Sequence, residues 1–156
     1  MASDDLLISA KRRIQVADHF LTQTYPLVQD PKLLINILDG ILHAVEETVD
    51  ALLQHERAHE RIPAYHEGNF AAKLSVIRGD VAKRYGFGHI DLAMISEMQE
   101  LLHDHRESAM EFSRHGKYVM ANSNLEIQTI SVEKIKTYLT RSKALYQKVH
   151  DTLLQP

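Results

Sequence analysis

The chain has 156 residues, no cysteine and a formal net charge of −3 at pH 7. One ordinary domain, residues 1–156, fits this length, and a chain without cysteine forms no disulfides, thiolate nucleophiles or cysteine-ligated zinc sites. We expect a soluble, cytoplasmic protein without membrane contact, because no apolar run reaches bilayer length and Asp4 and Asp5 stand where a secretion signal carries positive charge.

Apolar side chains recur at helical spacing over most of the chain. Ser3 can cap the first helix, which we expect to end at Tyr25-Pro26. Asp30-Pro31 joins an N-cap residue to a proline at the first helical position, which starts a second helix about 45 Å long. The expected helices span residues 3–25, 31–61, 69–84, 90–107 and 131–153.

The pattern changes from helical to alternating between residues 117 and 130. Leu125, Ile127 and Thr129 alternate with polar residues after a turn at 122–124. This alternation predicts a short β-hairpin. The expected fold is therefore mainly α, an antiparallel bundle of about five helices with a short β-hairpin before the last helix.

Residues 55–59 read H-E-x-x-H, the pattern with which a helix places two imidazoles beside one zinc ion. His55 and His59 would be ligands, and Glu56 would be the general base. About 0.05 such matches are expected by chance in a chain of this composition. Candidates for a third ligand are Glu97, Glu100 and Glu111, none of which lies in a supporting motif.

Helical projection places Glu56 and His59 close to the buried stripe of the second helix, and His55 at its edge. A buried carboxylate needs a cation, so either a basic residue pairs with Glu56 or a metal sits beside it. Arg57 and Arg61 are the nearest basic partners in sequence, and pairing is the interpretation that we favour. The metal interpretation stays as the alternative.

A second Glu-x-x-His pair, Glu100 and His103, has the spacing used by ferritin-like di-iron bundles. Projection places both residues toward solvent, on the face opposite Met98. His105 instead points inward, where it is expected to be a hydrogen-bonded core histidine.

A second candidate site is basic and lies around the start of the hairpin. Arg114, His115 and Lys117 surround a glycine, and Arg106 precedes them by one or two helical turns. These groups could bind phosphate or a carboxylate. The competing interpretation is a basic loop that neutralises Glu111 and the C-terminal end of the fourth helix.

The Ala-rich, Tyr-containing pair of helices in residues 10–53, together with the overall bundle, resembles HEPN-type domains, and the chain also resembles small uncharacterised helical proteins of archaeal genomes. The HEPN resemblance implies a helical dimer, and in its ribonuclease members an arginine four to six residues before a histidine that assists proton transfer at the ribose 2′-hydroxyl. None of the matching spacings lies late in the bundle, where that family's motif sits. They are Arg13 with His19, Arg61 with His66, and Arg84 with His89.

Three functions follow as hypotheses. The favoured one is a non-catalytic bundle without a cofactor, which associates with itself or with a protein partner through a helical face. The second is an HEPN-like RNA-binding protein or ribonuclease, although the net negative charge does not favour nucleic acid. The third is a zinc-dependent hydrolase centred on His55, Glu56 and His59.

Overall fold

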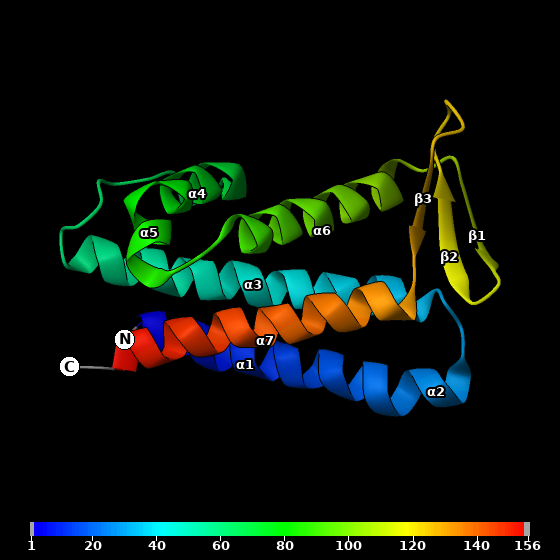
Figure 1. The fold of residues 1–156 in the computed structure, drawn as a ribbon, viewed down its shortest axis with the longest axis horizontal. Helices are drawn as coiled ribbons and strands as arrows, with labels where there is room; N and C mark the ends of the chain where they lie inside the picture. Colours follow the sequence, from blue (N-terminus) through cyan, green and yellow to red (C-terminus); the bar gives the residue numbers. More distant parts are fainter. Residues whose placement is uncertain (1, 155–156) are drawn as a thin grey trace.

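A computed structural model describes residues 2–154 and shows long helices packed side by side, with a small antiparallel sheet at one end (Figure 1). The fold is mainly α, and the sheet directly precedes the last helix, as the sequence predicts. None of the described helices is long and apolar enough to cross a membrane. The elements in chain order are α1 (Ala2–His19), the π-helical turn η1 (Phe20–Thr24), α2 (Tyr25–Val28), α3 (Leu33–Ala58), α4 (Phe70–Val76), the π-helical turn η2 (Ile77–Val81), α5 (Ala82–Tyr85), α6 (His89–Glu107), β1 (Met110–Arg114), β2 (Lys117–Ala121), β3 (Ile127–Ile130) and α7 (Val132–Leu154).

The central helix is α3, which packs against α1, α6 and α7. Its apolar residues occupy one continuous stripe, and burying that stripe is the main source of stability for a helix of this kind. The stripe residues are all buried: Leu34, Leu38, Ile41, Val45, Val49 and Leu52.

The first helix differs from the expectation at both ends. It begins at Ala2, so Ser3 lies within its first turn and is not the cap. It also continues past Tyr25-Pro26, because a π turn, in which the Tyr25 N–H bonds to the Phe20 carbonyl, widens the helix directly before the proline. The helix ends instead at Gln29, whose backbone is left-handed (φ 53°).

The second helix begins at Leu33, two residues after the expected start at Pro31, and the Asp30 carboxylate accepts the Lys32 N–H (3.0 Å) in the turn before it. It ends at Ala58, about one turn before the expected Arg61, since Glu60 adopts a left-handed backbone (φ 56°). This early end changes where the last motif residues point.

The helix expected over residues 69–84 is present but kinked. The Asn69 side chain caps its start by accepting the Ala72 N–H (3.2 Å), and Gly86 ends it in the left-handed conformation that glycine favours. A kink at Gly79 (φ −82°, ψ −134°) divides it into α4 and α5. The kink places α5 near the end of α3, where the H-E-x-x-H motif lies (Figure 1).

The sheet has the strand order β1-β2-β3, with both neighbouring pairs antiparallel. The predicted hairpin is confirmed as β2 and β3. Strand β1 was not expected: it pairs with β2 through a two-residue turn, His115-Gly116, in which both residues have positive φ (51° and 74°). That geometry is a type I′ turn, whose twist matches the twist of the strands.

Candidate functional site

The H-E-x-x-H residues occupy the last turn of α3. Glu56 is fully buried and His55 is half-buried, as the helical projection predicts. His59 is exposed, so its expected inward position is wrong. The helix has already ended there, and the projection no longer applies. The His59 ring contacts the His55 ring in a tilted arrangement, with 4.3 Å between ring centroids, and its Nδ1 lies 2.9 Å from the His55 carbonyl oxygen.

Arginines, as the favoured interpretation expects, neutralise the buried Glu56. Arg84 Nη1 lies 2.8 Å from its Oε1, and Arg61 Nη1 lies 3.4 Å from its Oε2. Burial alone would raise the pKa of this carboxyl, but hydrogen bonds from Tyr85 and Arg84 and the charges of both arginines outweigh burial and lower the pKa. Arg57, the other expected partner, pairs with Glu67 (3.2 Å) instead.

Within residues 2–154, no three His, Asp or Glu side chains are arranged to hold one metal ion. Burial lowers the pKa of His55, and His59 and Arg61 lower it further, which favours a neutral ring. The charged groups next to Glu56, however, are the cations Arg61 and Arg84, and a cation cannot be a zinc ligand. The described residues thus give the zinc hypothesis two histidines without a third ligand.

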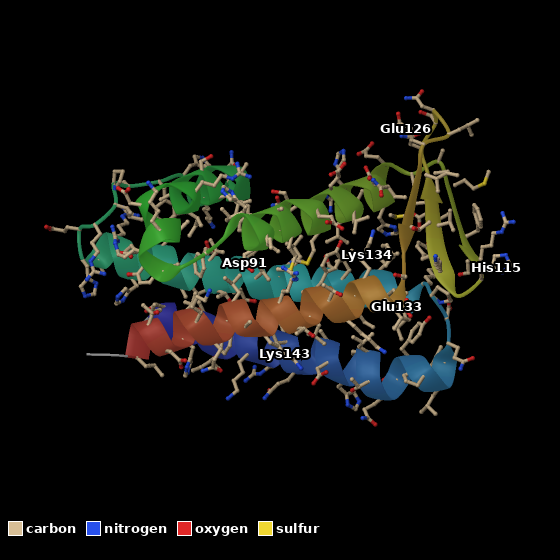
Figure 2. The ribbon with its side chains drawn as sticks, in the orientation of Figure 1. Asp91, His115, Glu126, Glu133, Lys134 and Lys143 are labelled. Carbon is tan, nitrogen blue, oxygen red and sulfur yellow. The ribbon has the colours of Figure 1, made fainter. Side chains whose placement is uncertain are left out.

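The basic residues of the second candidate site lie at two places. Arg114, His115 and Lys117 are exposed around the β1–β2 turn, at the tip of the hairpin (Figure 2), and Arg106 is exposed in the last turn of α6. Arg114 and Lys117 are direct cross-strand neighbours. None of the four forms an ion pair or hydrogen bond with the described residues. They do not neutralise Glu111, so that part of the competing interpretation is wrong.

Glu111 is satisfied by a different set of groups and anchors β1 to the bundle. The hydroxyls of Ser108 and Tyr118 donate to its two carboxylate oxygens, and His105 Nδ1 lies 2.7 Å from Oε1. These hydrogen bonds, with the His105 charge, outweigh burial and lower the pKa of the Glu111 carboxyl. His105 is therefore hydrogen-bonded, as the sequence predicts, but its side chain is 35% exposed and does not lie in the core as expected. Glu100 is exposed, as predicted.

The two faces of the sheet differ in what covers them. One face carries Tyr118, Met120 and Ile130, which belong to the main apolar core. The apolar residues of the other side, called here the outer face, lie apart from that core and are Met110, Phe112, Val119, Ala121 and Ile127. By the strand register, the same side also carries Arg114 and Lys117 next to the turn and Thr129 on β3.

The outer face is exposed to solvent at its margins. Met110, Phe112 and Ile127 are 60%, 38% and 63% exposed, while Val119 and Ala121 are buried between their neighbours on this face. An antiparallel sheet with one face on the core normally turns polar residues toward water on the other. A contiguous apolar outer face is therefore typical of an interaction surface.

The edge of β1 that faces away from β2 has no partner strand among the described residues. Residues of a two-residue hairpin alternate between bonding across the pair and pointing their N–H and C=O outward. Arg114 and Lys117, the pair next to the turn, bond to each other across the hairpin. Counting back along β1 from this pair, Ser113 and Glu111 are the residues whose N–H and C=O point to the free edge. The opposite edge is partly blocked, since Lys134 Nζ donates to the Thr129 carbonyl (3.3 Å).

Leu125, next to the outer face, is held in an unfavourable conformation. It is 81% exposed and its backbone is left-handed (φ 63°), a conformation that favours glycine or asparagine over leucine. Leu125→Asn is expected to raise the free energy of unfolding by about 1 kcal/mol, measured by urea denaturation. Ser123→Asn, in the same loop but without positive φ, serves as the control and should change little. Equal stability of Leu125→Asn and the wild type would contradict the prediction.

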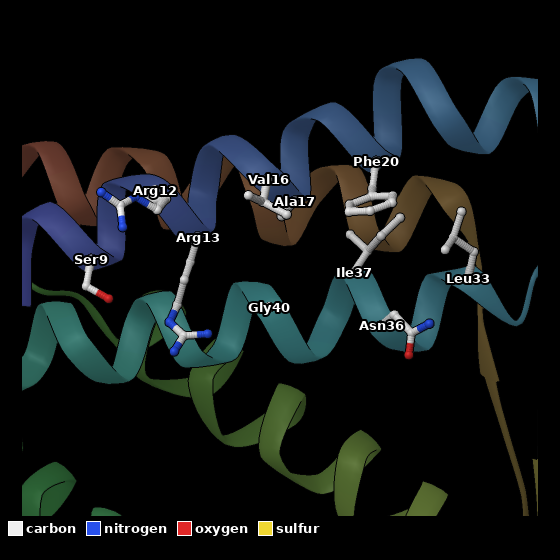
Figure 3. Close-up of a pocket in the computed structure, with 10 residues that line it drawn as sticks. All are labelled: Ser9, Arg12, Arg13, Val16, Ala17, Phe20, Leu33, Asn36, Ile37 and Gly40. Atoms are coloured by element: carbon white, nitrogen blue, oxygen red, sulfur yellow. The ribbon is translucent and has the colours of Figure 1, made fainter.

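A groove of about 460 Å³ lies between α1 and α3 (Figure 3). Phe20 and Ile37 meet across it, and Arg12 and Arg13 lie at one end, with Arg13 held in an ion pair to α3. The sequence predicts association through a helical face without specifying which one, and this groove is one candidate for it. Of its apolar lining, only Val16 and Phe20 are exposed, so it offers less free apolar surface than the sheet.

No family model matches this chain, and comparisons with curated proteins and with solved structures give no match either. The surface that the sequence did not identify is the outer face of the sheet together with the free edge of β1, named here the sheet surface. Its signal in the sequence is the alternation of Met110 and Phe112 with polar residues, followed by the turn glycine Gly116.

Proposed function

We propose that the protein acts by association with another polypeptide, without catalysis, through the sheet surface. The observation that carries this proposal is the contiguous apolar outer face beside an open strand edge. Either feature alone is a liability in a protein that works as a free monomer, since exposed edges and apolar patches both promote association. Their occurrence on the same three strands supports a dedicated interface.

The chemistry of the two candidate active sites supports a non-catalytic role. Glu56 and Glu111 are the two most enclosed carboxylates of these sites, and both oxygens of each accept from neighbouring donors. These contacts lower the pKa of both carboxyls, which makes them weaker bases, whereas a general base works best with a pKa near the operating pH. The proposal includes no cofactor and a cytoplasmic location, which the cysteine-free sequence supports.

The test uses Phe112→Lys, which places a charge at the centre of the sheet surface. Sedimentation velocity over a range of concentrations should show self-association of the wild type and at least about a tenfold weaker association of the variant, because a buried lysine without a partner is costly. Ile8→Lys is the matched control, since Ile8 is an exposed apolar residue (60%) of α1. It should leave association unchanged.

Two outcomes would overturn the proposal. One is a wild-type protein that stays monomeric up to millimolar concentration. The other is self-association that Ile8→Lys weakens and Phe112→Lys does not. That result would show that the interface lies on the helices and not on the sheet.

A further inference from the structure

We infer that the partner is a second copy of this chain, whose β1 pairs antiparallel with β1 across a two-fold axis at Phe112. This inference rests on the proposed function and names its partner. The result would be one continuous six-stranded sheet. The free edge of β1 selects this arrangement, because its backbone groups are open while the β3 edge is partly capped by Lys134.

The position of the unpaired groups fixes the register. Glu111 and Ser113 are the β1 residues whose N–H and C=O point to the free edge. An antiparallel pairing that places Glu111 opposite Ser113 of the second copy uses all of these groups, in about four intermolecular hydrogen bonds. If the two-fold axis passed through Glu111 instead, Ser113 would face a residue that lies before β1. If it passed through Ser113, Glu111 would face a residue of the turn after β1. Self-pairing also guarantees that each edge meets an identical set of donors and acceptors.

The same register brings the two Phe112 side chains together. Phe112 would face its symmetry mate in a non-hydrogen-bonded pair, where Cα atoms approach to about 4.5 Å and aromatic side chains interact favourably. Phe112 and Met110 are partly exposed now, and each would gain a cross-strand neighbour from the second copy. Ile127 lies on β3, two strands away from the axis, and would stay outside the contact.

Charge and shape both permit this dimer. Arg114 would stand beside Met110 of the second copy, so the two basic turns lie at opposite ends of the paired strands, about 14 Å apart along the strand direction. That separation exceeds the Debye length of about 8 Å at physiological ionic strength. In addition, β1 is the strand farthest from the helices (Figure 1), which leaves room for a second sheet.

A cysteine scan tests the register directly, because the natural chain has no cysteine. Phe112→Cys should form a disulfide dimer readily under mild oxidation, since cysteines in this pair fall within the Cα separation of about 4.4–6.8 Å that disulfides need. Met110→Cys, on the same face of the same strand, is the control. In the inferred register its symmetry mates are about 14 Å apart along the strand, and it should not cross-link. Efficient cross-linking of Met110→Cys with none of Phe112→Cys would overturn the register.

Two further variants separate this inference from the proposed function. Ser113→Pro removes an N–H that the β1–β2 ladder does not use, so it should abolish the dimer in sedimentation velocity without unfolding the sheet. Ile127→Lys should leave the dimer intact. If Ile127→Lys disrupts association and Ser113→Pro does not, the sheets pack face to face and the inferred pairing is wrong, while the proposed function stands. If Ser113→Pro, Ile127→Lys and Phe112→Lys all leave association unchanged, both fail.

Discussion

Glu56→Gln is expected to lower the free energy of unfolding by about 2 kcal/mol at neutral pH, in the range found for hydrogen bonds to charged groups. The amide keeps the shape of the side chain but removes the negative charge that the guanidiniums of Arg84 and Arg61 share. Urea denaturation monitored by circular dichroism measures the change. An unchanged midpoint would show that the ion pairs contribute nothing to stability.

Arg84→Met is the matched experiment and should lower the free energy of unfolding by more than Glu56→Gln does. Removing the arginine leaves a carboxylate in a fully buried position with one cation fewer, whereas the arginines left by Glu56→Gln are partly exposed and can be hydrated. A smaller loss for Arg84→Met than for Glu56→Gln would mean that Glu56 finds another cation.

The pH dependence follows from the lowered pKa of Glu56. The usual value for this carboxyl is 4.5, and the folded protein holds it lower. The stability that Glu56 contributes is therefore fully present above pH 4.5 and is lost as the pH falls through the folded value. The difference in unfolding free energy between the wild type and Arg84→Met should consequently narrow in acid, and a constant difference would contradict the assigned ion pair.

The arginine partner of Glu56 illustrates what the sequence could and could not predict. Helical projection from Val45 correctly placed Glu56 in the core, because that step needs only the period of the helix. Arg84 lies 28 residues later on α5 and reaches Glu56 only because α4 and α5 fold back over the end of α3. His59 was misplaced for a related reason, since a left-handed Glu60 ends the helix without the usual glycine signal.

In the sheet, too, the sequence pattern predicts the strands but not how they pack against the helices. Alternation identified β2 and β3, but it does not tell which alternate face the core covers. Ile127 and Ile130 are both isoleucines of β3, yet Ile127 is 63% exposed and Ile130 is fully buried. Strand β1 was missed because the charges around the turn at His115 made residues 111–118 read as a basic loop.

Glu111→Leu is the second large effect that we expect, with a loss of about 3 kcal/mol of unfolding free energy. The substitution removes the acceptor for Ser108, Tyr118 and His105 at once, and the Tyr118 hydroxyl is then left buried without its partner. Because this carboxylate holds β1 to the end of α6, the variant should also lose self-association. Urea denaturation and sedimentation velocity measure the two effects on the same sample.

Tyr118→Phe removes one of these hydrogen bonds and should cost about 1 kcal/mol at neutral pH. Burial, then the hydrogen bond and charge of Glu111, raise the pKa of Tyr118 from 10.0 to about 12. The tyrosine therefore contributes stability that is fully present below pH 10 and is lost as the pH rises toward 12. The stability difference between the wild type and Tyr118→Phe should shrink over that interval, and a difference that grows would contradict the hydrogen bond to Glu111.

Self-association that persists in Glu111→Leu would show that β1 need not be anchored for the contact, and the interface would then have to lie outside this strand.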